Sequence, residues 1–352
     1  MIWLPILLAD PSACLRFLVL RDLFQRESQD EELLECAASR LSDPLVQRIL
    51  AVQDEDGSWP PGALAIGRAG GTRVLMTGMA LSRLGYLGFH EELPAVRKGA
   101  EYLFACQNED GSWNLPDQYE EEQHEEAPQS TRERYSMIPL QTAFPLRGLA
   151  ACGYAADPRA EKAYEWLLAQ RLVDGAWPTG IASGVYGYVA GYRRLAHSRW
   201  GCRSNTTGAL MCLSLHPVRR SGPEAQRALD LLLGRETRDR QAVGFEVARM
   251  VGAEPARGFM SHFARYDLAM LLDLCSRVGA SAQDPRVDDL LQFIDSLQGA
   301  YGLWEYSAHP QVSRWLTLDL LRSKTRLGRN QDWIGMEPRT PFQPYPKPHR
   351  RF

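Results

Sequence analysis

Gln53-Asp54-Glu55-Asp56-Gly57-Ser58-Trp59 is the stretch that decides the fold of this chain, because the same phrase returns further along. Its pattern, Gln-x-x-x-Gly-x-Trp, stands again at 107–113 and at 298–304. A looser copy, one residue longer, runs over 170–177, and the spacing of the tryptophans leaves room for a degenerate copy near Gly244-Phe245. A motif that recurs along most of a chain indicates a repeat architecture. The sequence therefore predicts about five copies of one structural unit.

Each unit is predicted to be a helical hairpin. An amphipathic stretch precedes the phrase, introduced three times by Asp-Pro, at 43–44, 157–158 and 284–285. Asp caps free backbone N–H groups, and Pro at the first helical position forfeits no hydrogen bond, so sharp helix starts are expected. A less charged stretch of helical length, such as 74–81, follows the phrase. Four glycines are expected to end these second helices in the left-handed conformation: Gly85, Gly153, Gly279 and Gly328.

These phrases between an outer and an inner helix resemble those of the squalene-hopene and oxidosqualene cyclases, and more distantly the β subunits of protein prenyltransferases. The resemblance covers roughly 45–328. It implies an all-α fold, an α/α toroid of five to six helical hairpins. The stretches at 265–269 (Arg-Tyr-Asp-Leu-Ala) and 313–318 (Ser-Arg-Trp-Leu-Thr-Leu) also resemble a set of short single-domain bacterial relatives.

Three parts of the chain are expected: an N-terminal helical cap over 1–42, the toroid over 43–328, and a proline-rich tail over 329–352. The net charge of −3 gives no reason to expect a nucleic-acid partner. Seven cysteines without paired spacing indicate a reduced, cytoplasmic protein. The apolar first nine residues lack a basic region before them, which argues against a signal peptide. Peripheral contact of this segment with a membrane stays open, as does the oligomeric state.

Two segments break the repeat and are candidates for specificity. The first is an acidic insertion over 117–126, whose carboxylates suit Mg²⁺ if the substrate is a diphosphate; a solvated surface loop is the alternative. The second, 184–203, combines glycines and tyrosines with four arginines. Arginines bind anionic groups through charge-assisted hydrogen bonds, so this segment is interpreted as an entrance loop, or else as an exposed loop with incidental arginines.

In the resembled toroids the first halves of the inner helices line a central cavity, which assigns this chain's candidate substrate-binding residues. Together with neighbours from the second insertion they are Arg73, Met76, Tyr135, Trp200, Cys202, Arg203, Asn205, Arg265 and Trp315. Aromatic faces among them are suited to stabilising a carbocation. The expected partner is a small hydrophobic molecule, an isoprenoid.

The candidate catalytic residues are Asp267 as an acid or electrostatic anchor, His262 nearby, and Tyr266 as an aromatic stabiliser. Cyclases of the resembled family that protonate an alkene carry Asp-x-Asp-Asp, and this chain has no such run. Asp267 falls on the last aspartate of that pattern, while Tyr266 stands where the proton donor belongs. The structural alternative is a buried Asp267 paired with Arg265 or another arginine.

No cofactor is expected, and no metal site. A zinc site like that of the prenyltransferase β subunits would need Asp273-Leu274-Cys275 together with His309, but the pair lies late in its helix. The leading hypothesis is a terpenoid cyclase or isomerase that uses carbocation chemistry. Two alternatives remain open: a non-catalytic binder of lipid or isoprenoid, and a toroid used as a scaffold for protein interactions.

Overall fold

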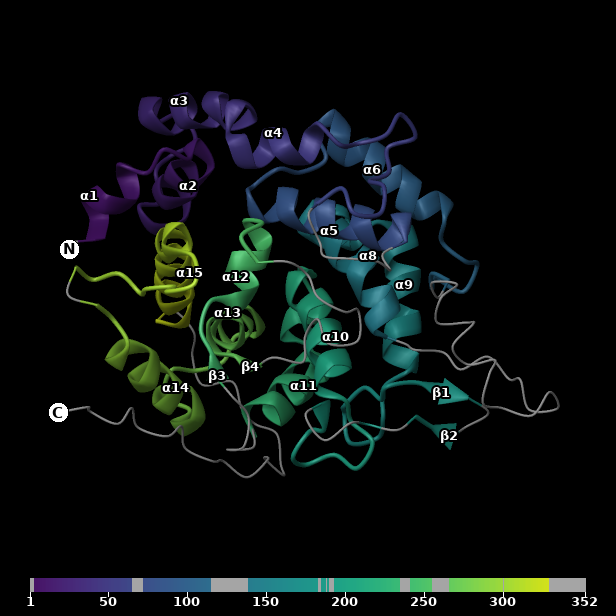
Figure 1. Ribbon diagram of the computed structural model, residues 1–352. Helices are drawn as coiled ribbons and strands as arrows, with labels where there is room; N and C mark the ends of the chain where they lie inside the picture. The colour runs from purple at the N-terminus through teal and green to yellow at the C-terminus, as the bar shows by residue number, and fades with distance from the viewer. Residues whose placement is uncertain are drawn as a thin grey trace. The chain divides into compact units, whose positions relative to one another are not determined.

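The computed structural model describes residues 3–64, 72–114, 139–182, 185–187, 189, 193–234, 241–254, 266–299 and 301–328 (Figure 1). Helices dominate these residues, and the described strands form two short pairs. Strand β1 (Ile181–Ala182) is antiparallel to β2 (Val185–Tyr186), with Ile181 opposite Tyr186. Strand β3 (Gln241–Ala242) is parallel to β4 (Tyr266–Asp267), with Gln241 opposite Tyr266. The all-α prediction is confirmed.

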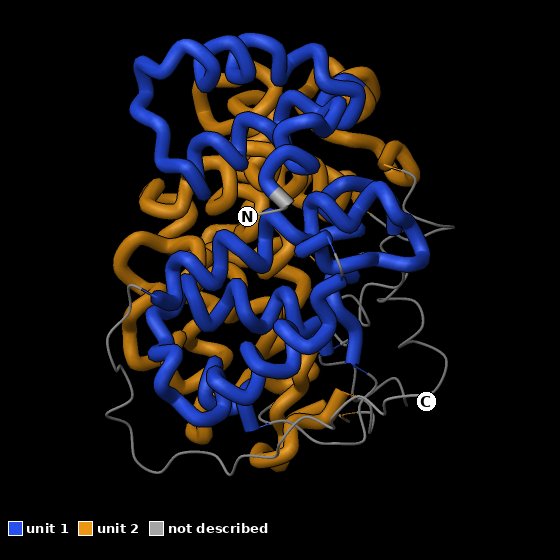
Figure 2. The backbone as a smooth tube through the Cα atoms, turned by 90° about the vertical axis from the view of Figure 1, so that its left-hand side faces the viewer, with its two compact units in different colours: residues 1–47, 229–254, 265–352 blue, residues 48–228, 255–264 orange. Residues whose placement is uncertain are grey.

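The chain divides into two compact units (Figure 2). Unit 1 consists of Met1–Gln47, Leu229–Glu254 and Arg265–Phe352. Besides β3 and β4, its elements are α1 (Trp3–Leu8), α2 (Ala13–Leu18), the π-helix η1 (Val19–Leu23), α3 (Glu31–Ser39), the 3₁₀-helix η2 (Arg40–Ser42), α12 (Phe245–Met250), α13 (Leu268–Val278), α14 (Pro285–Ser296), the 3₁₀-helix η8 (Pro310–Val312) and α15 (Ser313–Leu327). It thus includes the N-terminal segment expected to be a cap.

Unit 2 consists of Arg48–Ala228 and Pro255–Ala264. Besides β1 and β2, its elements are α5 (Arg73–Tyr86), α6 (Pro94–Ala105), α8 (Leu140–Ala151), the 3₁₀-helix η4 (Tyr154–Ala156), α9 (Pro158–Ala169), α10 (Arg203–Leu215) and the 3₁₀-helix η6 (Arg219–Ser221). Two outer helices, α4 (Pro44–Leu50) and α11 (Pro223–Leu233), straddle the division. Along the described chain, outer and inner helices therefore alternate as α4–α5, α6–α8, α9–α10, α11–α13 and α14–α15.

The tryptophans of the repeated phrase occupy equivalent places, as predicted. Each is at most 2% exposed. Each indole Nε1 donates, at 2.7–2.8 Å, to a backbone carbonyl ten residues earlier, in the last turn of the preceding outer helix. The four pairs are Trp59 with Ile49, Trp113 with Leu103, Trp177 with Leu167 and Trp304 with Ile294. A buried indole N–H needs such a partner, and this one fixes the turn against its helix.

A second hydrogen bond ties the phrase to the inner helix that follows. The backbone N–H of Trp59 donates to Thr77 Oγ1 at 3.1 Å. The corresponding donors in two other copies are Trp177, to Thr206 at 3.0 Å, and Trp304, to Thr317 at 3.0 Å. The two bonded residues are 18, 29 and 13 positions apart in the sequence, respectively. The same anchor therefore closes segments of very different length.

The glutamine and glycine of the phrase connect one unit to the next. Gln53 Nε2 donates to the carbonyl of Ala95 in α6 at 2.9 Å, and Gln107 Nε2 does the same to Arg159 in α9 at 3.0 Å. Gly57 has φ +87°, and a Cβ there would lie 2.5 Å from the Lys98 carbonyl oxygen. Only glycine combines this backbone conformation with so close an approach. The phrase thus binds the following outer helix.

The degenerate unit replaces tryptophan with tyrosine. Gly244 keeps the positive φ of the other copies, at +87°. Tyr266 is 6% exposed, and its hydroxyl donates to the carbonyl of Leu232 in the last turn of α11. This is the contact that the indole N–H makes in the other units.

The predicted helix starts are confirmed. Asp43, Asp157 and Asp284 each accept from a backbone N–H two residues ahead, at 2.8–2.9 Å. The helix ends agree in part: Gly153 and Gly279 adopt φ of +99° and +97° after α8 and α13.

The prediction that glycine ends the helix in the left-handed conformation was wrong for Gly328, which has φ −62°, and for Gly85. Gly85 lies inside α5, where a Cβ would come within 2.5 Å of the Ala151 carbonyl oxygen of α8. It serves helix packing instead, and Gly88 adopts the positive φ just beyond α5, at +86°.

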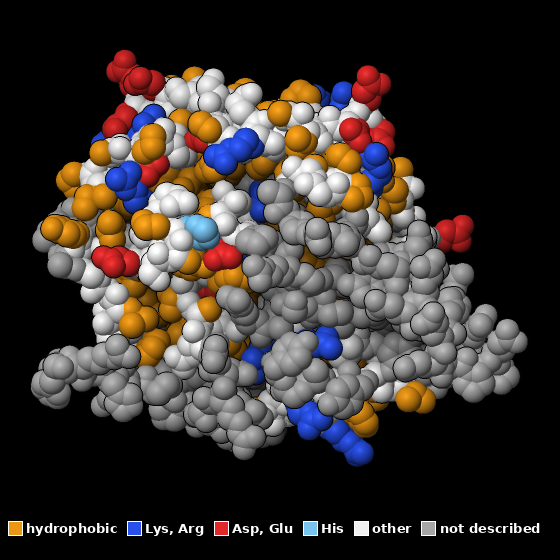
Figure 3. Space-filling model, viewed as in Figure 1, with side chains coloured by type: hydrophobic (Ala, Val, Ile, Leu, Met, Phe, Trp, Pro, Cys, Tyr) orange, Lys and Arg blue, Asp and Glu red, His pale blue; other side chains and the backbone are white. Residues whose placement is uncertain are grey.

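Gly78 and Gly148 lie at the same α5–α8 contact, where a Cβ on Gly148 would meet the Gly78 carbonyl at 2.5 Å. Small residues therefore let these inner helices approach closely. Along the top of the face in Figure 3, basic and acidic side chains are interspersed. Among the described residues, no helix combines the length and the apolar character needed to cross a membrane.

Candidate functional site

Four of the predicted substrate-binding residues lie in the first turn of α10 or just before it. Cys202 precedes the helix and is fully buried, and its N–H donates to the Trp177 carbonyl at 2.8 Å. Arg203 is 4% exposed, and Asn205 Nδ2 donates to the Thr179 carbonyl at 3.1 Å. Trp200 is 37% exposed, and its ring centroid lies 5.9 Å from that of Tyr186.

Two buried hydroxyls lie in the same region. Ser204, in the first turn of α10, is 0% exposed, and Thr179 is 7% exposed. Neither side-chain oxygen has a hydrogen-bond partner among the residues that the structure describes. Buried polar groups are usually paired, so each marks a position where a polar group is accommodated poorly by the protein alone.

Arg73 and Met76 begin α5. Arg73 forms an ion pair with Asp54, and its Nη1 donates to Ser58 Oγ at 2.7 Å, so it is held against the repeated phrase. Met76 is 7% exposed. Trp315, in the first turn of α15, is 4% exposed. Tyr135, His262, Arg265 and the acidic insertion 117–126 lie outside the described residues.

Asp267 caps α13 and is 2% exposed. Its Oδ1 accepts from the N–H groups of Gly244 at 3.0 Å and Ala269 at 3.1 Å, and its Oδ2 accepts from Glu246 N–H at 2.6 Å. Burial raises the pKa of Asp267 above its usual range. The nearby Glu246 raises this pKa further, whereas the three N–H donors lower it. The contacts are those of a helix cap that also ties β4 to the start of α12.

The residues considered for zinc are engaged elsewhere. Asp273 accepts from Arg277 and Arg326, Cys275 is fully buried, and His309 Nε2 lies 3.6 Å from Glu254 Oε1. Burial raises the pKa of the Cys275 thiol far above its usual range, which disfavours a thiolate. The described part of the chain contains no group of three potential metal ligands.

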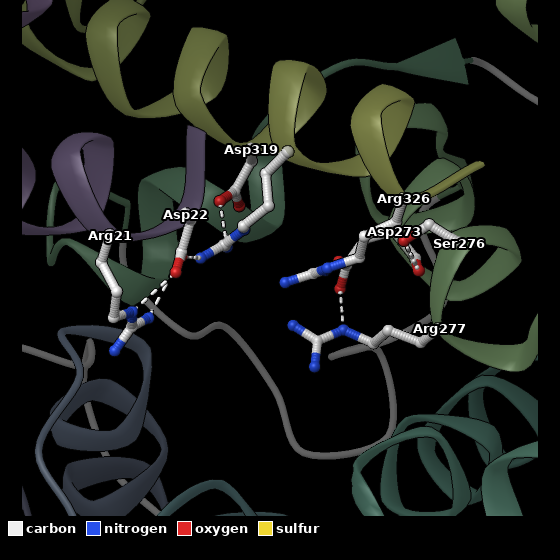
Figure 4. Close-up of polar contacts among 8 residues, drawn as sticks. Arg21, Asp22, Asp273, Ser276, Arg277, Asp319 and Arg326 are labelled. Carbon is white, nitrogen blue, oxygen red and sulfur yellow. Dashed lines mark hydrogen bonds and ion pairs between the residues drawn. The ribbon is translucent and has the colours of Figure 1, made fainter. Parts of the chain in front are cut away.

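A cluster of charged residues in unit 1, which sequence reasoning missed, joins η1, α13 and α15 (Figure 4). We call it the arginine cluster; its members are Arg21, Asp22, Asp273, Arg277, Asp319, Arg322 and Arg326. The carboxylate of Asp22 forms ion pairs with Arg21, at a nitrogen–oxygen distance of 2.6 Å, and with Arg322, at 3.1 Å. The carboxylate of Asp273 pairs in the same way with Arg277 at 2.6 Å and with Arg326 at 3.1 Å. That of Asp319 pairs with Arg322 at 2.5 Å.

The cluster strongly perturbs its ionisable groups. Burial raises the pKa of Asp319 to about 6, although Arg322 opposes the shift, and Asp273 adds to it. Burial also works to raise the pKa of Asp273, but Arg277, Arg326 and Arg322 together hold it at about 2. Burial lowers the pKa of Arg326 to about 10. Asp273 acts to raise this pKa, and two neighbouring arginines act to lower it. Such divergent values are more frequent at functional sites than elsewhere.

Part of the arginine cluster had a signal in the sequence. Asp319 and Arg322, and likewise Asp273 and Arg277, are spaced three and four residues apart, so each pair shares a helix face. The link from α15 to η1 had none, because Asp22 is 300 residues away from Arg322.

Comparison with known proteins connects this structure to one family. Residues 31–190 match the squalene-hopene cyclase C-terminal domain model. A squalene-hopene cyclase of Zymomonas mobilis is 30% identical over 169 residues, which is 47% of this chain and 23% of the relative. That of Bradyrhizobium diazoefficiens is 29% identical over 128 residues, 36% of this chain and 17% of the relative. Part of the chain is therefore similar to the squalene-hopene cyclases.

The chain thus spans less than a quarter of the length of these two curated relatives. Among solved structures, a variant of the type II terpene cyclase MstE from Scytonema, in complex with geranylgeranyl dihydroxybenzoate, is similar at a TM-score of 0.44 and 14% identity, over 80% of this chain and 74% of that one. A protein from Actinoplanes is similar at 0.43 and 15%, over 90% of each chain. The helical composition and the match to a squalene-hopene cyclase domain agree with the predicted α/α toroid class, with its squalene cyclase repeats.

Proposed function

We propose that this protein is a terpenoid cyclase or isomerase that acts on a hydrophobic isoprenoid. The observation that carries the proposal is the match of residues 31–190 to a squalene-hopene cyclase domain. The chemistry such an enzyme performs needs a water-poor surface and aromatic faces near the developing cation. Met76 in unit 2 and Trp315 in unit 1 each lie near the start of an inner helix and are 7% and 4% exposed.

The proposal assigns Asp267 an electrostatic role rather than that of a proton donor. Three backbone N–H groups point at its carboxyl oxygens and favour the ionised form, against the burial that raises the pKa of Asp267. An ionised carboxylate stabilises a nearby cation but cannot protonate an alkene. A substrate that already carries a leaving group, or another acid, would then have to start the reaction.

The test is direct turnover. The purified protein is incubated with squalene, and separately with farnesyl and geranylgeranyl derivatives, and extracts are analysed by gas chromatography with mass spectrometry. We expect a product isomeric with squalene or, from a substrate that carries a leaving group, a product that has lost that group; the product is lost in Trp315→Leu and retained after EDTA treatment. Arg220→Gln, a change at an exposed position, serves as the control. Absence of any product with all substrates would contradict an enzymatic role.

A second function is favoured by one specific observation. Because each carboxyl oxygen of Asp267 is occupied, this candidate acid is equally consistent with a protein that binds an isoprenoid without converting it. Mass spectrometry of lipids that copurify with the protein separates the two: an unaltered isoprenoid in stoichiometric amount, together with no turnover, supports the binder.

A further inference from the structure

The arginine cluster has more positive than negative charge. Four arginines and three aspartates belong to it, which leaves one positive charge when all seven are ionised. The crowding is visible in Arg326, whose pKa is lowered by burial and by its like-charged neighbours. A buried or half-buried cluster with uncompensated charge is stabilised by a counter-charge.

The hydrogen-bond donors of the cluster are only partly used. Among the described residues, Arg277 donates through Nε alone, to Asp273, and its two terminal nitrogens have no partner. Arg326 donates through Nη1 alone, to the same carboxylate at 3.1 Å. The side chains of Arg277 and Arg326 are 25% and 34% exposed, so a ligand can reach them.

The two guanidinium groups are also oriented alike. Figure 4 shows the side chains of Arg277, from α13, and Arg326, from α15, on either side of Asp273. Their free ends point in the same direction, toward the side on which Asp22 and Arg21 lie. Shared attachment to Asp273 fixes both groups in advance, which reduces the entropy lost when they bind a ligand.

We propose that Arg277 and Arg326 together bind the carboxylate of a ligand. Planar guanidinium groups match the geometry of a carboxylate and form bidentate, charge-assisted hydrogen bonds with it. A single negative charge balances the surplus of the cluster, whereas a diphosphate brings more charge than the cluster offsets. The ligand class is therefore an organic acid. The inference that the ligand is an isoprenoid rests on the proposed function, whereas the inference that it carries a carboxylate does not.

Asp319 makes this binding depend on pH. The groups that face it are Arg322 and Arg326 of α15 and Asp273 and Arg277 of α13. With its pKa at about 6, Asp319 loses its negative charge as the pH falls through that value, and the surplus of the cluster increases. A carboxylate ligand, which stays ionised at pH 5.5, is then expected to bind more tightly at pH 5.5 than at pH 7.5.

The experiment compares three probes with the same chain: farnesoic acid, farnesol and farnesyl diphosphate. Isothermal titration calorimetry is expected to show farnesoate binding about tenfold more tightly than farnesol, the size of one charge-assisted hydrogen bond. Arg277→Gln and Arg326→Gln are expected to abolish that preference while leaving farnesol affinity unchanged. Arg220→Gln, at an exposed arginine of η6, is the matched control and retains the preference.

Equal affinity for acid and alcohol overturns the carboxylate site, although farnesol binding would still support the proposed function. Tighter binding of the diphosphate overturns the choice of a monoanion. If no probe binds, the proposed function fails, and the site is judged by labelling with phenylglyoxal, an arginine-selective reagent. Protection of Arg277 and Arg326 by benzoate but not by benzyl alcohol supports the site, and equal labelling in both overturns it.

Discussion

Asp22 and Arg322 are 300 residues apart in the sequence, yet the carboxylate of one lies 3.1 Å from the guanidinium of the other. Arg322 is 8% exposed and Asp22 is 14% exposed. Since Arg322 also donates to Asp319, it links η1 near the start of the chain to the last described helix, α15. The N-terminal segment is therefore an integral part of unit 1.

Removal of this arginine is expected to destabilise the protein. Arg322→Met keeps much of the side-chain volume but leaves Asp319 without its ion-pair partner, and Asp22 with Arg21 alone. Breaking a buried pair in this way costs about 3–5 kcal/mol, and we expect about 3 kcal/mol in urea-induced unfolding because Asp22 keeps one partner. Arg220→Met is the control. A loss smaller than about 0.5 kcal/mol would show that the pairing contributes nothing to stability.

Gly57→Ala is expected to weaken the contact between successive units. The alanine Cβ would lie 2.5 Å from the Lys98 carbonyl oxygen, at a φ of +87°. Gly62 provides the matched control, since its φ is +82° and nothing lies within 4 Å of its Cβ position. Gly62→Ala measures the backbone strain alone, about 1 kcal/mol, and Gly57→Ala is expected to cost about 2 kcal/mol more. Equal midpoints in urea would contradict the steric argument.

Asp319→Asn is expected to alter how stability depends on pH. A carboxyl group whose folded-state pKa is raised binds its proton more tightly in the folded protein, so its contribution favours folding below about pH 4 and is lost as the pH rises through about 6. The variant has no carboxyl group here, so its stability does not decrease for this reason as the pH rises. The free energy of unfolding of the variant, relative to that of the wild type, is therefore expected to increase by about 1–3 kcal/mol between pH 4.5 and pH 7.5.

Asp273 does not obscure that comparison. Its folded-state pKa is held down at about 2, so its stabilising contribution is present above pH 4 and is lost only as the pH falls toward 2. Chemical denaturation at the two pH values measures the difference. If the free energies of unfolding of variant and wild type differ by the same amount at both pH values, Asp319 titrates at its ordinary pKa.

Asp267→Asn is expected to lower stability before it affects anything else. An asparagine offers one acceptor oxygen, so its amide nitrogen must face an N–H group that Asp267 now satisfies. We expect a loss of about 1–3 kcal/mol, measured by thermal unfolding. If Asp267 also stabilises a cation, turnover of an isoprenoid measured well below the melting temperature drops by ~10²-fold. Unchanged turnover in the folded variant removes Asp267 from the mechanism.

The local parts of the fold could be predicted from sequence because their causes are local. Asp157 and Pro158 begin a helix through a cap and a fixed φ that involve neighbouring residues only. Trp113 could be placed because the whole phrase recurs. Gly85 was misassigned since a glycine near a helix end suits a C-cap as well as close packing, and only its neighbour Ala151 decides between them.

The candidate site was less accessible to such reasoning. Cys202 and Asn205 could be placed at the start of an inner helix because the resemblance marks such starts. The hydroxyl of Tyr266 binds α11, a role that depends on Leu232 and has no signature in the sequence. The arginine cluster depends on Asp22, whose contact with Arg322 reflects the packing of unit 1 and not any spacing. Residues that meet only through tertiary structure leave no periodic pattern to detect.

The bond from the tryptophan N–H to a threonine of the inner helix, made in three of the units, has an evolutionary consequence. It joins residues that are 18 positions apart for Trp59 and Thr77, 29 for Trp177 and Thr206, and 13 for Trp304 and Thr317. Because both ends of the segment are fixed, residues can be gained or lost within it at a small entropic cost without moving the helices. In such a scaffold the helices can stay in place while the segments between them change in length and sequence. New specificities can therefore evolve in these segments without a change in the helical frame.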